Sequence, residues 1–357
     1  MSARLRIVLD QVAHTVDADQ SAASMSLAAG LVATAPSGCA VDAIVPAGGS
    51  VTLAGIKDVR VLGLARRELA TSWQLGVTAG VGKGMIHAPT LMAPLVRHDR
   101  VHENHQITAT VWDLRAWEAP ELLPKNVVAW QRAMLKRAAK HADAVVVPSH
   151  AVARSLAEVA RIGDRVRVIA GAAPQGFTIP PHAAELRAAL SLPEEYVVLT
   201  GPLESLTEGF RGVVAAGLDA VVLDAPEGSE PRHAEVASAA GLPERRVHVR
   251  GYLTEEERAA VLAGSSAFVA TSAIAGWPWR AVEAMALGIP VVALNTGSHQ
   301  DVIADGGLLV ASESIAEAIV DAVGGAADRL GVLAADRSRA FSWASSAERV
   351  WALHADL

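Results

Sequence analysis

A chain of 357 residues is long for one hydrophobic core and sufficient for two domains. Half of its residues (51%) are apolar and only 4% are aromatic, a composition typical of parallel sheets covered by helices on both faces. The formal net charge of −7 gives no support for nucleic acid as a partner.

The single cysteine, Cys39, excludes an internal disulfide and a cysteine-rich metal site, and it is typical of a reducing cytosol. The first residues carry too short an apolar core for a signal peptide. No apolar run reaches the roughly 18–20 residues that span a bilayer. We therefore expect a cytoplasmic protein, which contacts a membrane at most peripherally, at the inner membrane face.

Short apolar runs bounded by turn residues recur through the first half of the chain and predict β-strands. These strands are expected at Leu5–Leu9, Val41–Val45, Val59–Leu62, Met85–His87, Ile107–Trp112, Ala144–Val147 and Val166–Ile169. Helical patterns separate most of them, for example at Ala22–Ala33, Val127–His141 and Ala151–Val159.

The second half repeats this alternation. Its strands are expected at Val197–Thr200, Ala220–Leu223, Val247–Arg250, Ala267–Ala270, Val291–Leu294 and Leu308–Val310. Strands that alternate with helices predict right-handed crossovers on parallel sheets. The sequence therefore predicts an α/β protein with two doubly wound domains, whose ligands lie at the carboxyl ends of the strands.

A Pro/Gly-rich stretch at 171–181 predicts a hinge between the two domains. We expect an N-terminal Rossmann-like domain over residues 1–172 and a C-terminal one over 173–338. Residues 339–357 predict a final helix, with Trp343 and Trp351 as its anchors.

The most informative stretch is Ser272–Val310. Within it, Pro278 predicts the start of a short helix, Gly288 its end, and Pro290–Leu294 a strand. Glu283 lies inside this helix. The stretch resembles the nucleotide-sugar site of the family 4 retaining glycosyltransferases, which have the GT-B fold of two doubly wound Rossmann-like domains facing a cleft.

Other segments extend the resemblance over nearly the whole chain. ATVWDLRAWEAPELLP (109–124) is similar to the family's Thr-Val-His-Asp segment, and VVLTGPLESLTEGF (197–210) is similar to its Val-Gly-Arg-Leu loop. The run RVHVRGYLTEEERAAVLAGSSAFVATS (246–272) looks like the approach to the donor loop. The resemblance also implies that the last helix returns to the N-terminal domain.

The resemblance implies a donor site without a metal and without a cofactor other than the nucleotide-sugar substrate. Three residues are implied next to the reacting groups: Trp112, Asp113 and Gly276. Five more are implied in donor binding: Gly201, Arg211, Tyr252, Arg280 and Glu283.

The chain departs from the family at the positions that touch donor and acceptor. Pro202 and Glu208 stand where the family has an arginine and a lysine, and Ala275 stands where it has its first glutamate. Trp112 replaces the family histidine, and residues 12–27 contain none of the expected glycines. A leaving diphosphate needs cations or N–H donors.

Two arginines offer a replacement for the missing cations. Arg211 lies three residues beyond Glu208, on the same helix face, and Arg280 lies beside the donor loop. Simpler interpretations remain open: Arg280 and Glu283 form an i, i+3 pair on an exposed face, and Arg211 is a solvated helix cation. His299, after the next strand, is either a loop residue or a ligand contact.

Several further motifs have a plain interpretation. Asp17-Ala-Asp19 is favoured as a solvated acidic turn over a metal-binding Asp-x-Asp motif. AGVGKGM (79–85) lacks the first glycine of a phosphate loop and the Ser/Thr after Lys83, so it is not one. The basic face of the helix at 131–141 is favoured as a solvated surface over a contact with anionic lipid.

Two functions remain open. The first is a glycosyltransferase that moves a hexose, with retention, from a nucleotide sugar to a carbohydrate or lipid-linked acceptor; the nearest family branches suggest mannose or rhamnose. The second is a catalytically degenerate relative that serves as partner or scaffold of an active glycosyltransferase.

Overall fold

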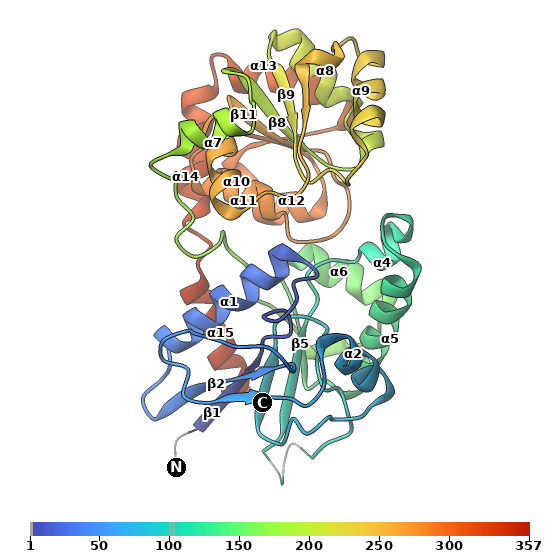
Figure 1. Ribbon diagram of the computed structural model, residues 1–357, viewed down its shortest axis with the longest axis vertical. Helices are drawn as coiled ribbons and strands as arrows, with labels where there is room; N and C mark the ends of the chain where they lie inside the picture. The colour runs from blue at the N-terminus through green and yellow to red at the C-terminus, as the bar shows by residue number, and fades with distance from the viewer. Residues whose placement is uncertain (1–2, 100–101, 103) are drawn as a thin grey trace. The chain divides into compact units, whose positions relative to one another are not determined.

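The computed structural model describes residues 3–99, 102 and 104–357, and these form two compact units (Figure 1). Unit 1 comprises the chain up to Ala172 together with Ile274–Trp277 and Phe341–Leu357. Unit 2 comprises Ala173–Ala273 and Pro278–Ala340. Each unit contains one parallel sheet with helices around it, which confirms the predicted α/β class.

Unit 1 is built on a seven-stranded parallel sheet with the order β3-β2-β1-β4-β5-β6-β7. Its strands are β1 (Ala3–Val8), β2 (Cys39–Val45), β3 (Val59–Val61), β4 (Met85–Ala88), β5 (Gln106–Thr110), β6 (Ala144–Val147) and β7 (Val166–Val168). Its helices are α1 (Ala18–Ala33), α2 (Arg66–Leu75), α4 (Arg115–Glu118), α5 (Lys125–His141), α6 (His150–Val159) and α15 (Trp343–Asp356).

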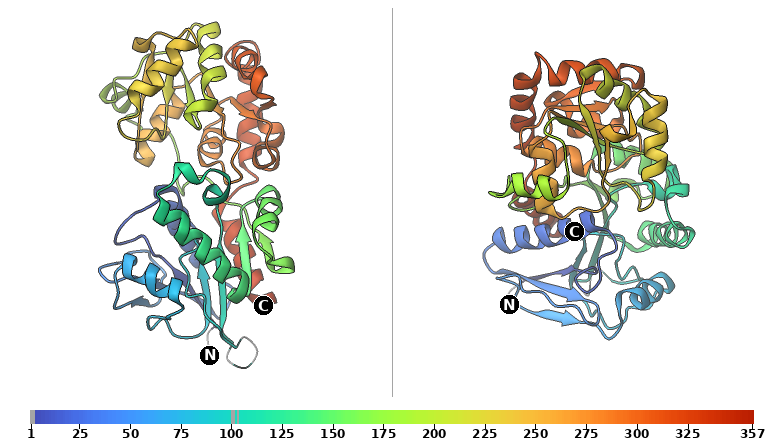
Figure 2. Two further views of the ribbon diagram at one scale, coloured as in Figure 1. Left: turned by 90° about the vertical axis from the view of Figure 1, so that its right-hand side faces the viewer. Right: turned by 45° about the horizontal axis from the view of Figure 1, so that its top comes forward.

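Helices cover both faces of this sheet (Figures 1 and 2). On one face, α2, α5 and α6 bury a single apolar cluster that includes Trp73, Met134 and Leu156. On the other face, α15 packs against α1, and the indole N–H of Trp351 donates to the Leu31 carbonyl at 3.1 Å. Burial on both faces explains why the central strands are continuously apolar.

Unit 2 contains a six-stranded parallel sheet with the order β10-β9-β8-β11-β12-β13. Its strands are β8 (Tyr196–Thr200), β9 (Asp219–Val222), β10 (Val247–Val249), β11 (Ala267–Ala270), β12 (Val291–Leu294) and β13 (Leu308–Val310). Its helices are α7 (Ala183–Ala189), α8 (Thr207–Ala216), α9 (Glu230–Ala239), α10 (Glu255–Ala263), α11 (Trp279–Ala286), α12 (Gly297–Val302), α13 (Ile315–Val323) and α14 (Ala327–Ser338).

All thirteen strands predicted from the sequence are present, with boundaries that differ by at most two residues. Helix starts differ more. Helix α1 begins at Ala18 rather than Ala22, because the Asp17 side chain caps it by accepting from the Gln20 amide at 3.0 Å. Helix α11 begins at Trp279, with Pro278 as the residue before its first turn rather than within it.

Two buried histidines meet where α15 covers the sheet of unit 1. Nδ1 of His87 lies 2.8 Å from the Thr108 hydroxyl, and Nδ1 of His354 lies 2.9 Å from the Gln106 side-chain oxygen. The two rings are edge to face at 5.7 Å, and neither Nε2 atom has a hydrogen-bond partner among the described residues. Both rings therefore sit in surroundings that disfavour a second proton.

This contact predicts a loss of stability in acid. Burial lowers the pKa of His354 to about 4 from its usual 6.5, against the opposing effect of Asp143. Burial, and next the charge of His354, also lower the pKa of His87. The unfolded chain therefore takes up these protons first as the pH falls. Stability is complete above about pH 6.5 and is lost toward pH 4. We expect His354 to account for about 2 kcal/mol of unfolding free energy lost between pH 7.5 and pH 5.

Urea denaturation at the two pH values tests this expectation. His354→Phe removes the titrating group at similar volume, so its unfolding free energy should fall less than that of the wild type. The exposed His150 provides a control, since His150→Gln should keep the wild-type pH dependence. An unchanged pH dependence in His354→Phe would contradict the account.

Candidate functional site

Each sheet has one point where the strand order reverses direction. In unit 1 this switch point lies between β1 and β4, and in unit 2 it lies between β8 and β11. Ligands of doubly wound sheets bind beyond the carboxyl ends of the strands at such points. The residues that follow these four strands are therefore the first candidates for a site in each unit.

In unit 1, the residue pair after β1 and β4 is Asp10 and Thr90. Asp10 is only 2% exposed; it accepts from Nε of Arg66 at 2.8 Å and from the Thr90 hydroxyl at 3.3 Å. Burial raises the pKa of the Asp10 carboxyl, while Arg66 and the hydrogen bonds oppose that rise. Arg66 opens α2, so this ion pair ties the helix to the switch point.

A cavity of about 720 Å³ lies above this pair. Side-chain amides, hydroxyls and two indoles contribute to its lining: Gln11, Gln20, Gln74, Asn126, Gln131, Thr71, Thr90, Thr110, Trp112 and Trp130. Amides and hydroxyls exchange hydrogen bonds in both directions, and indole faces bury apolar ring surfaces. This lining suits a polyhydroxylated ligand.

Three of the charged groups on the cavity wall pair with one another. Nη2 of Arg115 donates to Asp113 at 2.9 Å and to Asp17 at 3.2 Å. Burial by itself would lower the pKa of Arg115, but the two carboxylates outweigh burial and raise that pKa, so Arg115 stays charged. Asp17 thus caps α1 and holds Arg115, which corrects the interpretation of Asp17-Ala-Asp19 as a solvated turn.

Three of the predicted residues, Trp112, Asp113 and Gly276, come together in unit 1. Asp113 and Gly276 form an antiparallel bridge, and the Trp277 amide donates to the Trp112 carbonyl at 3.0 Å. The Ala275 amide donates to the Glu118 carboxylate at 2.6 Å. The amides that flank Gly276 are therefore already hydrogen-bonded within unit 1.

Trp112 is a structural side chain as well as a wall of the cavity. It is 5% exposed, and its indole N–H donates to the Pro89 carbonyl at 2.7 Å. An indole offers no acceptor, so Trp112 does not reproduce the hydrogen-bonding capacity of the family histidine.

In unit 2, the switch point is closed by a tight turn after β8. Gly201 has φ +143°, and a Cβ there would lie 2.1 Å from Oγ1 of Thr271, which follows β11. The hydroxyls of Ser205 and Thr271 are 2.6 Å apart. Only glycine fits this backbone at this distance, so the turn brings the first loop of unit 2 against the end of β11.

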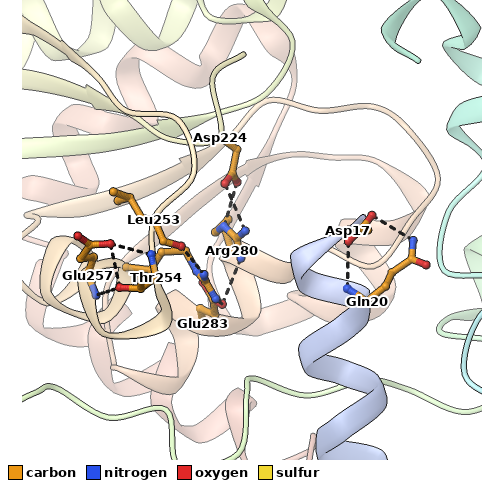
Figure 3. Close-up of polar contacts among 9 residues, drawn as sticks. Asp17, Gln20, Asp224, Leu253, Thr254, Glu257, Arg280 and Glu283 are labelled. Carbon is orange, nitrogen blue, oxygen red and sulfur yellow. Dashed lines mark hydrogen bonds and ion pairs between the residues drawn. The ribbon is translucent and has the colours of Figure 1, made fainter. Parts of the chain in front are cut away.

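Glu283 is the centre of a buried ion cluster (Figure 3). Arg258 donates to its carboxylate through Nη2 at 2.8 Å and Nε at 3.1 Å, and Arg280 donates through Nη1 at 3.1 Å. Glu283 is 1% exposed. The Arg280–Glu283 pair of the sequence analysis therefore exists, but on a buried face rather than an exposed one.

Arg280 is also held from its other side. Its Nε and Nη2 donate to the two oxygens of Asp224 at 2.9 and 3.2 Å (Figure 3). The Asp224 side chain is 45% exposed, and its backbone has φ +59°, a strained value for a residue with a side chain. Asp224 is thus the exposed, replaceable end of the cluster.

The other predicted donor residues lie apart from this cluster or are already paired. Arg211 forms an ion pair with Glu208 on α8. Glu208 stands where the family has a lysine, so this substituted residue already pairs with the arginine that was expected to replace the missing cation. Tyr252 is 75% exposed, in the loop before α10. His299 lies in α12 rather than in a loop; it is buried, with Nδ1 2.7 Å from the Leu294 carbonyl, and burial lowers its pKa.

The basic face of α5 is partly committed to structure. Arg132 donates to the Ala116 carbonyl at 2.9 Å, and Arg137 donates to the Leu95 carbonyl at 3.0 Å. These two side chains tie α5 to neighbouring segments, whereas Lys136 and Lys140 are exposed cations of the same face.

Sequence reasoning missed Arg258, Asp224, Asp10, Arg66 and Arg115. One signal was available for Arg258, which directly precedes the apolar run Ala259–Leu262 in a helix. Another was available for Asp10, which follows the first strand after one apolar residue. Among the described residues, no group of three or more His, Cys, Asp or Glu side chains is arranged to hold a metal ion.

Residues 203–328 match the family model described as "Glycosyl transferases group 1". This segment contains Arg258, Arg280 and Glu283. No curated protein sequence matches the chain. Within the described part of the chain, no helix has the length and apolar character needed to cross a membrane.

Solved structures match the chain over its full length. Sucrose-phosphate synthase from Thermosynechococcus elongatus matches with a TM-score of 0.70 at 21% identity, covering 99% of this chain and 98% of that one. HepE from Anabaena, solved with UDP and glucose, matches with a TM-score of 0.68 at 17% identity, covering 99% and 100%. These similarities, with the two parallel sheets, confirm the predicted GT-B fold of two Rossmann-like domains.

Removing the charge of Glu283 should destabilise the protein. Glu283→Gln leaves two buried arginines short of a counter-charge, so we expect a loss of about 3 kcal/mol of unfolding free energy in urea denaturation. Glu235→Gln, at an exposed carboxylate on α9, is the matched control and should change stability by less than about 0.5 kcal/mol. Equal stabilities of the two variants would contradict the buried ion cluster.

Adding a methyl group at Gly201 should disrupt the turn after β8. Gly201→Ala places a Cβ against Thr271, whereas Gly228→Ala meets no atom within 4 Å at a residue that also has a positive φ. We expect Gly201→Ala to cost about 2 kcal/mol more unfolding free energy than Gly228→Ala. If Gly201→Ala loses no more unfolding free energy than Gly228→Ala, the loop rearranges to accommodate the methyl group, which contradicts a rigid turn.

Proposed function

We propose that this chain is a GT-B glycosyltransferase that takes a hexose from a uridine diphosphate sugar and transfers it, with retention, to a carbohydrate or lipid-linked acceptor. The match of residues 203–328 to a glycosyltransferase family model supports transfer. HepE, a full-length structural match, was solved with UDP-glucose, which favours UDP over other nucleotides. The transfer needs no metal if protein cations stabilise the leaving diphosphate.

The fixed position of Arg280, between Glu283 and Asp224, is the observation on which this proposal rests. Negative charge develops on the departing diphosphate, and a cation fixed in advance stabilises it without reorganisation. Pro202 and Glu208 supply no cation. Arg280 lies in the matched segment, fixed by Glu283 from a buried side and bonded to Asp224 on its exposed side. A diphosphate would take the place of the Asp224 carboxylate on the same guanidinium edge, in the bidentate geometry that arginine prefers.

In this proposal, Glu283 acts by positioning Arg280, and it does not contact the ribose. Gly201 brings the first loop of unit 2 close enough for its backbone to approach the donor, and Tyr252 and Arg211 remain candidate contacts further out. Asp113 and Trp112 would line the acceptor side, within the cavity of unit 1 whose amides and hydroxyls suit sugar hydroxyls, and Gly276 is bridged to Asp113.

The proposal predicts a ligand-dependent rise in melting temperature. UDP at about one hundred times its dissociation constant should add about 2.7 kcal/mol of stability, whereas GDP and dTDP at equal concentration should add less. Differential scanning fluorimetry measures the shift. A larger shift with GDP or dTDP would still support a glycosyltransferase, but one whose donor carries that nucleotide instead of UDP.

Arg280→Gln should weaken UDP binding by about tenfold or more, because a charge-assisted contact to phosphate is lost while Arg258 still neutralises Glu283. Isothermal titration of UDP into the wild type and the variant gives the ratio. Arg211→Gln is the comparison, and we expect a smaller loss because Glu208 already pairs with Arg211. Unchanged affinity in both variants would remove the replacement-cation argument.

A second function has its own support. Glu283 is enclosed by two arginines, and Glu208, in the first turn of α8, stands where the family has a lysine. Both features suit a degenerate GT-B protein that acts as partner or scaffold of an active glycosyltransferase. No thermal shift with any of the three nucleotides, together with co-purification of a second glycosyltransferase, would favour this function over transfer.

A further inference from the structure

A second pocket of about 720 Å³ lies at the opposite end of the unit 1 strands from Asp10 and Thr90. Arg4 and Arg6 of β1 and Arg60 of β3 line it, together with the backbone that leads into β4. The amino-terminal halves of these parallel strands form its base. It is therefore separate from the cavity at the carboxyl ends of the same strands.

Positive charge predominates on the walls of this pocket. Four cations, Arg4, Arg6, Arg60 and Lys83, face two carboxylates, Asp42 and Asp58. Arg4 is bonded to both Asp42 oxygens, at 3.1 and 3.2 Å. Cations therefore outnumber carboxylates among the described residues that line the pocket.

Two of the guanidinium groups lie beside the same glycine. A Cβ at Gly82 would lie 3.4 Å from Nη1 of Arg6 and 3.8 Å from Nη1 of Arg60. Burial, and next the charge of Arg60, lower the pKa of Arg6, whereas Asp42 and Asp58 oppose that decrease. The charge of Arg6, which is half-buried, and that of Arg60, which is exposed, thus repel one another, and a bound anion would relieve that repulsion.

The backbone on this wall is the AGVGKGM segment. Gly80, Gly82 and Gly84 have φ values of +76°, +82° and +121°, so the chain turns at alternate residues. Arg6 fixes this turn by donating to the Lys83 carbonyl at 2.9 Å and to the Val81 carbonyl. This contact holds the Arg6 guanidinium against the turn.

We infer that this pocket binds a phosphoryl anion between Arg6, Arg60, Lys83 and the Gly82 turn. Guanidinium groups match phosphate oxygens in pairs, which suits two arginines that lie beside one turn. The segment lacks the hydroxyl residue after Lys83 that would bring a magnesium ion, so the site takes the anion without a metal. The anion is either a free phosphate compound or the headgroup of a phospholipid.

This binding is independent of the proposed transfer reaction. The pocket shares no residue with the Arg280 cluster or with the cavity that contains Trp112. Loss of the anion site would therefore leave UDP binding unchanged, and loss of UDP binding would leave the anion site unchanged.

The test removes two exposed cations of the pocket from the full chain. Inorganic pyrophosphate binding is measured by isothermal titration, and vesicle binding by co-sedimentation with phosphatidylglycerol–phosphatidylcholine vesicles and with pure phosphatidylcholine vesicles. Arg60→Gln combined with Lys83→Gln should weaken the binding of the phosphoryl ligand by about tenfold. Arg232→Gln combined with Arg245→Gln removes the same charge from exposed positions of unit 2 and should change it by less than about threefold.

Binding of pyrophosphate that the pocket variant loses supports the site with a free phosphate compound as ligand. Binding of only the phosphatidylglycerol vesicles, again lost in the pocket variant, supports it with a lipid headgroup as ligand. Absence of both, or equal binding by the pocket variant and the wild type, overturns the inference. Arg60→Gln by itself is measured if the double variant does not fold, as judged by circular dichroism.

Discussion

The carboxylate of Glu283 bonds two buried arginines, whose charges it balances together with Asp224, and the candidate donor site of unit 2 depends on this cluster. Withdrawing such charges from water costs several kcal/mol for each ion, and only close, directed hydrogen bonds offset that cost. Arg258 occupies the inner side of the carboxylate and Arg280 the outer side. Arg280 can therefore point an edge of its guanidinium group toward the exposed Asp224 without moving when an anion arrives. A fixed cation of this kind is what a leaving diphosphate requires.

The two units place different chemistry at their switch points. Unit 1 ends in a cavity lined by amides, hydroxyls and indoles, where Arg66 and Arg115 are each neutralised by carboxylates. Unit 2 ends in the tight turn at Gly201 and the cluster around Glu283. The first set suits an uncharged, hydroxyl-rich acceptor, and the second suits an anionic donor. Under the proposed function, this division would let a chain with Pro202 and Glu208 distinguish an anionic donor from an uncharged acceptor.

Local patterns in the sequence were sufficient to predict the sheets, because buried parallel strands appear as short apolar runs between turn residues. All thirteen strands and the GT-B fold followed from such runs and from the resemblance. The ion pairs between residues far apart in the sequence did not follow, because a charged residue carries no local mark of a distant partner. Arg258 and Glu283 are separated by 25 residues, and Arg115 and Asp17 by 98. For the same reason, Asp17 was interpreted from the sequence as part of a solvated turn, and the Arg280–Glu283 pair was expected on an exposed face.

A crystal structure of the chain with UDP tests the central claim most directly. If Arg280 is the replacement cation, phosphate oxygens will lie within hydrogen-bonding distance of its guanidinium group, the Asp224 carboxylate will have moved away, and the contacts between Glu283 and Arg258 will be unchanged. A structure in which UDP is bound while Arg280 still holds both oxygens of Asp224, with the phosphates contacted by other residues, would contradict it.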